Sequence, residues 1–416
     1  MENQRQPLIF SRRIRRLTAS AQGFFLTKGK QNLIIITALI ALSAIFFVIN
    51  SSFLDRYNIV SMIQSLAPYA IMALGVTFVI ATGGIDLSIG TVCIASAVVA
   101  GKLLASPDGR VDASLVFYSI PIMIAIGMLF GLINGILVAR MKLPPFIATL
   151  GTMLLARGLS AIIVSVPNIF YPSLTDFNRL FSNSDGFPTG ALWVIVFTVI
   201  CMYLMYKNKV GRYILAIGSN EEATRLSGIS TDKYKMAAYI LSGLGAGIAA
   251  IFWAASFPTV AAATGNGMEL DAIAGVYIGG TSAAGGVASV FGSLTGSFLL
   301  VVIRSGLNMA LARFNLNVNA TYVTYVLTGI IVVAAVLIDV VKNKRASRGG
   351  ARREIKAIKA QYRELIQQQL RLQDELISRR DITGDEFEQR NGEILKKIDM
   401  LKQEREDKIN QISNRR

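Results

Sequence analysis

Residues 59–104 read IVSMIQSLAPYAIMALGVTFVIATGGIDLSIGTVCIASAVVAGKLL, two apolar runs joined by a short segment with two glycines and one carboxylate. Between Ile59 and Gly101, Asp86 is the only charged residue. An apolar run of about 20 residues is long enough to cross a bilayer as a helix. Adjacent glycines favour a helix break, and backbone groups freed at membrane depth must be covered by protein or line a water-filled cavity. The stretch therefore predicts two packed membrane helices with a break between them.

The composition of the whole chain is typical of a membrane protein and narrows the possible chemistry. Hydrophobic residues make up 53% of the 416 residues, with 36 glycines besides, and there is no histidine. Without histidine the chain cannot build a Ser-His-Asp triad or a His-ligated zinc or haem site. Cys93 and Cys201 lie inside apolar runs, which disfavours a disulfide framework or a paired-cysteine zinc site. We therefore expect no enzyme activity, no catalytic residues, no metal site and no cofactor.

Hydropathy predicts an all-α, polytopic membrane helix bundle of about ten transmembrane spans. Glycine and other small residues are dense in several of these spans, which lets helix backbones approach closely in lipid. The short runs within 270–303 could instead be half-helices or re-entrant segments. The predicted spans are 33–53, 59–81, 85–104, 114–139, 145–166, 190–206, 236–256, 270–284, 286–303 and 320–341.

The distribution of charge predicts the topology and three parts of the chain. Residues 1–32 form a basic N-terminal segment without the small-residue cleavage site of a signal peptide, so we expect the first span to be retained. Residues 33–345 form the transmembrane domain, and residues 346–416 form a charged helical tail. Basic residues gather in alternate loops, which the positive-inside rule places in the cytoplasm, with both termini. The basic loop residues are Arg140, Lys142, Lys207, Lys209, Arg212, Arg225, Lys233, Lys235, Lys342, Lys344 and Arg345.

Asp86, in the stretch ATGGIDLSIG at 81–90, is the most informative acid of the apolar region. A carboxylate there is costly unless it faces a polar interior, so it is a functional candidate. Three roles remain open: Asp86 or Ser88 caps the following helix, Asp86 borders a substrate path, or Asp86 couples transport to protons. For Arg304, at the end of the predicted span 286–303, the alternatives are pairing with a carboxylate and reaching to the membrane interface.

The segment AIGSNEEATRLSGI at 216–229 lies in the largest predicted internal cytosolic loop. Ser219 or Asn220 is a candidate N-cap, two glutamates follow in the first turn, and Gly228 lies at a plausible helix end. The pattern predicts a short exposed helix, which is either a docking element or an ordinary connector. No P-loop sequence occurs in the chain, so active transport requires an ATPase partner or an ion gradient.

Four motifs in order carry a family resemblance: ATGGIDLSIG at 81–90, PFIATLGTM at 145–153, the 216–229 segment, and ELDAIA at 269–274 followed by GGTS. Together they closely resemble the membrane permease subunit of bacterial ABC importers for ribose, galactose, xylose and related sugars. The resemblance covers about residues 33–345, the permease domain.

This resemblance implies a permease of the bacterial cytoplasmic (inner) membrane that forms the path for a monosaccharide. A periplasmic or surface-tethered sugar-binding protein would deliver the sugar, and a separate ATP-hydrolysing ABC subunit would drive transport. The permease would pair with a second copy or a sister permease within the membrane lipid. The resemblance assigns the ATPase-coupling loop to Asn220, Glu221, Glu222, Ala223, Arg225 and Gly228, and the translocation path to Gly83, Gly84, Asp86 and Ser88.

The Asp-Leu-Ser of the first motif favours sugars over branched-chain amino acids, but the particular sugar and the choice between homodimer and heterodimer stay open. The alternative is a secondary transporter or channel for a small polar solute that uses Asp86 for ion coupling. A third possibility is a membrane scaffold with a signalling tail.

The sequence pattern of the tail predicts a cytosolic helical hairpin or short coiled coil. Its first heptad seam is Ile355, Ile358, Tyr362, Leu365, Gln369, Leu372 and Leu376, and a capping-box signature at 383–386 precedes a second, weaker run. The tail has 17 basic and 13 acidic residues that roughly alternate, so nucleic-acid binding is not expected. The hypothesis is that the tail self-associates or contacts the ATPase.

Overall fold

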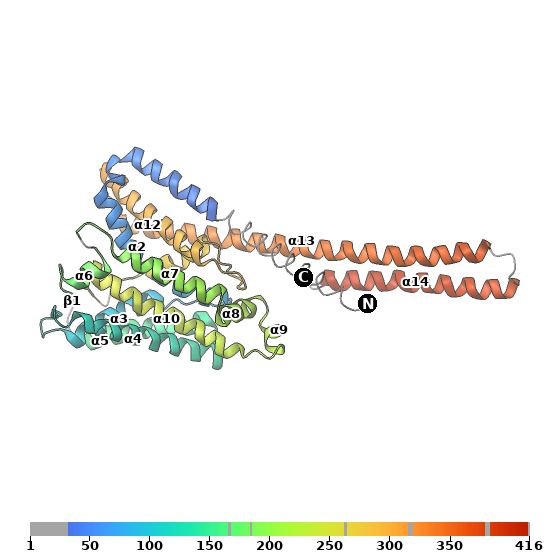
Figure 1. Cartoon of the computed structure of the whole chain (residues 1–416), viewed down its shortest axis with the longest axis horizontal. Helices are drawn as coiled ribbons and strands as arrows, with labels where there is room; N and C mark the ends of the chain where they lie inside the picture. The colour runs from blue at the N-terminus through green and yellow to red at the C-terminus, as the bar shows by residue number, and fades with distance from the viewer. Residues whose placement is uncertain are drawn as a thin grey trace, which may run out of the picture. The chain divides into compact units, whose positions relative to one another are not determined.

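The computed structural model describes residues 32–164, 168–183, 185–261, 264–314, 318, 320–378 and 383–414 (Figure 1). The chain divides into two compact units, Met1–Asp339 and Val340–Arg416. The predicted N-terminal segment 1–32 lies outside the described residues apart from Asn32.

The first unit is a bundle of helices. After a helix at Asn32–Ile49, its longer helices are α2 (Arg56–Ala81), α3 (Ile89–Leu104), α4 (Ser119–Gly135), α5 (Pro145–Val164), α7 (Gly190–Tyr206), α8 (Lys209–Ser219), α10 (Thr231–Ser256), α11 (Met268–Ile278), α12 (Val290–Arg313) and the start of α13 (Ala320–Ser378). The shorter ones are η1 (Ser51–Leu54), η2 (Val116–Tyr118), α6 (Asp176–Phe181) and α9 (Glu221–Leu226), and a π-helical turn, η3 (Ile136–Arg140), extends α4. Two short strands, β1 (Ile169–Phe170) and β2 (Thr259–Val260), pair antiparallel.

The polytopic helical bundle expected from the sequence is confirmed. Within the described residues, six helices are long and apolar enough to cross a membrane, or seven if the bent pair α7 and α8 is one span. Shorter apolar helices lie at Ile89–Leu104 and Tyr322–Ala334. Each of the ten predicted spans coincides with a helix, but the glycine-rich stretch between α11 and α12 is not helical, so α11 is only 11 residues long.

Helix α10 packs closely against α2, α3 and α4. Glycines make this possible: a Cβ added at Gly243 of α10 would lie 2.2 Å from the carbonyl oxygen of Gly127 in α4. A different face of α10 meets α2, where Gly245 approaches Gly75. Because lipid supplies no hydrophobic force between helices, such close backbone packing is what holds a membrane bundle together.

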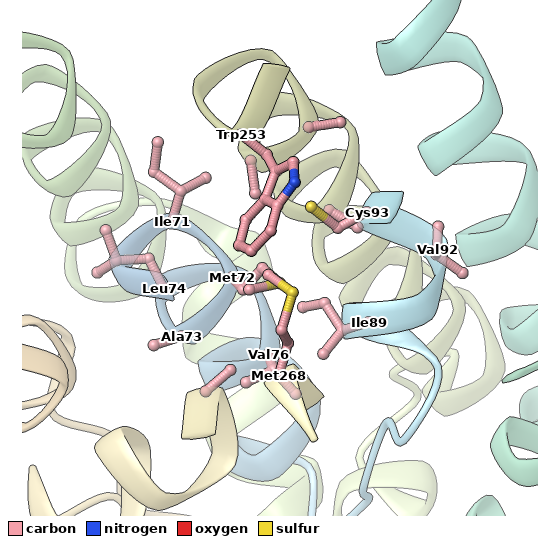
Figure 2. Close-up of a cluster of buried hydrophobic side chains, with 14 of the residues drawn as sticks. Ile71, Met72, Ala73, Leu74, Val76, Ile89, Val92, Cys93, Trp253 and Met268 are labelled. Atoms are coloured by element: carbon pink, nitrogen blue, oxygen red, sulfur yellow. The ribbon is translucent and has the colours of Figure 1, made fainter. Parts of the chain in front are cut away.

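Part of the buried apolar cluster of the bundle lies where α2 meets α3, α10 and α11 (Figure 2). Met72 of α2, Cys93 of α3, Trp253 of α10 and Met268 of α11 belong to one buried apolar cluster. These four helices therefore share one apolar core.

The second unit is a helical hairpin formed by the C-terminal part of α13 and by α14 (Gly384–Asn414). Tyr362 donates to Glu404 over 3.2 Å, and Gln373 donates to Asn391 over 2.8 Å, which sets the two helices antiparallel. The hairpin expected from the heptad pattern is thus present. Of the predicted seam, Tyr362 and Leu376 are buried whereas Leu372 is exposed, since a two-helix hairpin covers only a narrow stripe.

Candidate functional site

The break after α2 is built by local backbone chemistry. Thr82 ends the helix and its hydroxyl donates to the carbonyl oxygen of Val79 over 2.7 Å. Gly83 then adopts a φ of +81°, a left-handed conformation that favours glycine. Gly84 lies so close to Tyr239 that a Cβ there would be 2.9 Å from the phenol oxygen. The backbone conformation therefore favours glycine at 83, while the Tyr239 side chain lies close to Gly84.

Asp86 lies beyond the glycines and is only 2% exposed. One of its carboxylate oxygens accepts from the backbone N–H of Ser88 over 3.0 Å and from the Ser88 hydroxyl over 2.6 Å. The other oxygen accepts from the hydroxyl of Ser242 in α10 over 2.7 Å. The carboxylate thus binds the N–H of Ser88, the residue before α3, whereas no side-chain capping bond is made to α3 itself, so the capping role expected for Asp86 or Ser88 is not observed.

Ser88 extends this network to two further helices. Asn134 of α4 donates to the Ser88 hydroxyl over 2.8 Å, and Thr152 of α5 donates to the Asn134 side chain over 2.6 Å. We call Asp86, Ser88, Asn134, Thr152 and Ser242 the Asp86 cluster; all five are buried. It joins the start of α3 to α4, α5 and α10, so the break is a fixed junction of the bundle.

A second break, between α11 and α12, meets the first one. The N–H of Gly286 donates to the carbonyl oxygen of Ala81, the last residue of α2, over 3.0 Å. A Cβ on Gly285, whose φ is +81°, would be 2.7 Å from the backbone nitrogen of Gly83. Two segments about 200 residues apart are therefore in direct backbone contact.

The end of α8 packs into the same place. A Cβ added at Gly218 would lie 2.0 Å from the Ala81 carbonyl oxygen and 2.3 Å from the Gly286 nitrogen. We call Ala81, Gly83, Gly218, Gly285 and Gly286 the glycine junction. Backbone touches backbone here, and the Ser219 side chain also lies against Gly286, so the three segments have little room to adjust.

Helix α9 follows α8 directly, and its ends match the predicted signals. Of the two candidate caps, Asn220 accepts the N–H of Ala223 over 2.9 Å, while the Ser219 hydroxyl donates back into α8. Gly228, with a φ of +79°, ends the segment. Glu221 pairs with Lys235 of α10 over 2.6 Å, which holds α9 against the bundle.

The outer face of α9 is open. Glu222, Ala223 and Arg225 are exposed, and so is Leu226. Beside α9 lies a cavity of about 400 Å³, which Glu222 and Arg225 line together with Lys142, Leu143 and Pro144 from the turn between α4 and α5. We call this cavity the α9 groove. It combines both charge signs with an apolar floor, a combination suited to a protein partner.

Midway along α2 and α12, Arg304 of α12 pairs with Asp271 over 2.5 Å and donates to the phenol oxygen of Tyr69 over 2.8 Å. Thr328 donates to the same carboxylate over 3.3 Å. Of the two alternatives for Arg304, the structure therefore shows pairing with a carboxylate, that of Asp271. The sequence did not single out Tyr69, because a phenol inside a long apolar run gives no periodic signal; the buried charge of Arg304 was the only hint of a partner.

Comparison with known proteins places this geometry in a family. The family model described as branched-chain amino acid transport system / permease component matches residues 58–336. The ribose import permease protein RbsC of Escherichia coli K12 is 35% identical over 308 residues, which cover 73% of this chain and 91% of that protein. RbsC of Bacillus subtilis is 35% identical over 304 residues, covering 72% and 90%.

The fructose import permease protein FruG of Bifidobacterium longum is 33% identical over 337 residues, covering 77% of this chain and 94% of FruG. No solved structure matches the chain. The matched region contains both breaks, the Asp86 cluster and α9, and ends before the tail. The chain is therefore a multi-pass membrane protein that belongs to the family of branched-chain amino acid transport system permease components.

Proposed function

We propose that this chain is the transmembrane permease subunit of an ATP-binding cassette importer for a monosaccharide. The relatives named as ribose and fructose import permeases support the substrate class, since they align over most of both chains. A sugar-binding protein delivers the sugar, and a separate ATPase drives its import. The chain itself carries out no bond chemistry.

The observation that carries the proposal is α9, a capped and exposed helix beside an open groove. The ATPase docks in the α9 groove, where Glu222, Ala223 and Arg225 contact it. Asn220, Glu221 and Gly228 fix the conformation of the helix instead: they cap it, tie it to Lys235 and end it. The α9 groove and both chain termini lie in the cytoplasm, because the basic loops gather on that side.

The glycine junction transmits motion from α9 to the breaks. Gly218 lies at the end of α8, directly before α9, and it touches the backbone of Ala81 and Gly286. A tightly packed contact transmits displacement rather than absorbing it. When the ATPase moves α9, the ends of α2 and α12 move with it.

Gly83, Gly84, Asp86 and Ser88 border the translocation path in this proposal. The carboxylate of Asp86 has partners on both oxygens, so in this conformation it holds the start of α3 rather than offering an acceptor to a solute. Movement of the glycine junction shifts the position of this border. A second permease copy or a sister permease completes the path.

Reconstituted transport tests the proposal. The permease, its ATPase and the binding protein are placed in liposomes, and ATP hydrolysis and sugar uptake are measured together. Glu222→Lys and Gly228→Val, which change the docking face and the end of α9, are expected to lower uptake per ATP while the permease stays inserted. Leu174→Ala, a fully exposed side chain outside α9, serves as the control.

Three results would overturn the proposal. Unaltered uptake by both α9 variants would remove the docking role of this helix. Uptake by the purified chain alone under an ion gradient, without ATP, would favour the secondary transporter. The absence of sugar flux in every assembly would leave the membrane scaffold with a signalling tail as the remaining possibility.

A further inference from the structure

The helical hairpin of the second unit has a thin apolar core. Its two helices, α13 and α14, run side by side (Figure 1). Among the described residues of the hairpin, the buried apolar side chains are those of Tyr362, Leu376 and Ile398. Two polar side chains, those of Gln373 and Asn391, meet across the same seam. A small unit with so few buried apolar side chains normally needs a further partner to be stable, and a second copy is a common one.

An uncharged stripe runs along one side of α13, next to this seam. Leu365 and Leu372 are exposed, at 36% and 48%, and Ile358 is half-buried. These three residues are seven positions apart, so they follow one another along one side of the helix. Gln361 and Gln368, both exposed, lie between them at three- and four-residue steps. We call these five residues the leucine stripe, which is about 21 Å long.

The opposite side of α13 is basic. Lys356, Lys359, Arg363 and Arg371 are all exposed and follow one another at helical spacing. We call these four residues the basic row. With 3.6 residues per turn, the centre of the basic row lies about 160° around the helix from the centre of the leucine stripe. The first helix of the hairpin therefore has two sides of different chemistry.

Other exposed apolar side chains of α13 lie on the basic side. Leu370 and Ile377 are 43% and 61% exposed. Leu370 is seven residues after Arg363, so it lies next to that guanidinium-bearing position on the same side of the helix. A partner that covered Leu370 would also meet the charges of the basic row. The leucine stripe is thus the apolar surface of α13 that a partner can cover without burying a charge.

The leucine stripe is complementary to itself. When two copies of one helix pack in parallel about a two-fold axis, each residue meets its own counterpart. Like charges placed together in this way repel, so Lys359 and Arg363 oppose a contact through the basic row. In the leucine stripe the leucines would pack on leucines. The amides of Gln361 and Gln368 both donate and accept, so each can hydrogen bond to its own counterpart.

The membrane domain would bring two such stripes together. α13 starts at Ala320, and its apolar part at Tyr322–Ala334 precedes the tail in the chain. Two copies in one membrane therefore have their tails tethered at the same end, which suits a parallel contact. The leucine stripe covers only about two heptads, too few for a stable coiled coil of free helices. Tethering supplies what the short contact lacks, because it raises the effective concentration to about the millimolar range.

We propose that the leucine stripe is the surface through which the tails of two copies of this chain pair, α13 against α13 in parallel. The pairing rests on the proposed function only in that the complex contains a second permease subunit. It identifies that subunit as a further copy of this chain, the homodimer of the two alternatives that the sequence left open. The basic row stays on the outside of the pair.

Cysteine cross-linking of the full chain in its membrane tests the contact. Leu372→Cys places a thiol on the leucine stripe, and Arg371→Cys places one on the basic row, one residue away and also exposed. The wild-type chain, in which Cys93 and Cys201 are buried, gives the background. A disulfide requires Cα atoms within about 7 Å, so with a mild oxidant we expect Leu372→Cys to form dimers about tenfold faster than Arg371→Cys.

A charge on the leucine stripe should weaken the contact. Leu365→Glu, added to Leu372→Cys, places two carboxylates against each other, so the rate of dimer formation is expected to fall about tenfold. Arg363→Glu in the same background is the matched control, because it introduces the same side chain on the basic row and should leave the rate unchanged. Leu365 and Arg363 are both exposed, so neither change removes a buried side chain from the hairpin.

Three outcomes would overturn the inference. Equal rates for Leu372→Cys and Arg371→Cys would mean that the tails meet by random collision, and no dimer at all would mean that they do not meet. A disulfide between Leu372→Cys and a different protein, identified by the mass of the product, would assign the stripe to another partner such as the ATPase. These measurements use neither sugar nor ATP, so a failed contact leaves the proposed function standing, and a failure of sugar uptake leaves the pairing standing.

Discussion

Asp86 accepts three hydrogen bonds in a site closed to solvent, two from Ser88 and one from Ser242. Water cannot replace these partners, so the carboxylate and its donors depend on each other. Asp86 therefore has a structural role in the break after α2, whether or not it also borders the translocation path.

Replacing Asp86 by alanine should therefore destabilise the bundle. Each buried donor left without an acceptor costs about 1–3 kcal/mol, and Asp86→Ala leaves donors on Ser88 and Ser242 unpaired. The melting temperature of the purified chain, followed by size-exclusion chromatography after heating, should fall clearly. Ser96→Ala is the control, because that buried hydroxyl only donates to the Val92 carbonyl within its own helix. Equal melting temperatures for both variants would contradict a structural role.

The sequence could predict part of this site. A lone carboxylate in a long apolar run marked Asp86, and the adjacent glycines marked the break. Ser242, Asn134 and Thr152 could not be predicted, because many serines, threonines and asparagines lie in the apolar helices and only the packing determines which of them face Asp86. The same applies to Tyr69, whose phenol oxygen accepts from Arg304.

The glycine junction, at the scale of elements, joins α2, α8 and the second break through backbone contacts. Gly218→Ala would place a methyl group against the Ala81 carbonyl oxygen, which has nowhere to move. Such overpacking costs about 1–3 kcal/mol and should shift α8 relative to α2. We expect lower uptake per ATP hydrolysed in the reconstituted complex.

Gly151→Ala in α5 is the matched control for this variant, since nothing lies within 4 Å of the added methyl group. It should transport like the wild type. A Gly218→Ala protein that elutes as a single species and couples ATP hydrolysis to uptake normally would refute the proposed transmission through the junction.

The helices themselves were largely predictable, whereas their breaks were not fully so. Hydropathy located the apolar helices, because length and apolar content are local properties, although only six or seven of the described helices are long enough to cross a membrane. It started the span that corresponds to α3 at residue 85, and it continued the span 270–284 into the glycine-rich break between α11 and α12. Hydropathy does not record where glycine interrupts a helix. The structure starts α3 at Ile89 and ends α11 at Ile278.

The topology of the whole molecule can be tested by labelling, since Cys93 and Cys201 are buried and should not react. Leu174 and Leu226 are 92% and 83% exposed, on the sides that we expect to be outside and inside. A membrane-impermeant maleimide should label Leu174→Cys in intact cells and Leu226→Cys only in inside-out vesicles. The wild-type chain, unlabelled in both, is the control, and the reversed pattern would invert the topology.

The tail is a separate compact unit, and the family match ends before it. Deleting residues 349–416 should leave the permease domain inserted and monodisperse, because the core of that domain lies within the first unit. If the tail self-associates or contacts the ATPase, the deletion lowers the yield of assembled complex and the uptake rate. Wild-type values for both would exclude that role.

Helix α9 has only six residues. A helix so short does not persist in water by itself, so its shape depends on the Asn220 cap and on the ion pair with Lys235 of α10. A free peptide of the same sequence would lack that shape and should compete poorly for the ATPase. The docking surface thus exists only after the membrane helices have packed, which would keep the ATPase from being recruited to unfolded or half-inserted chains.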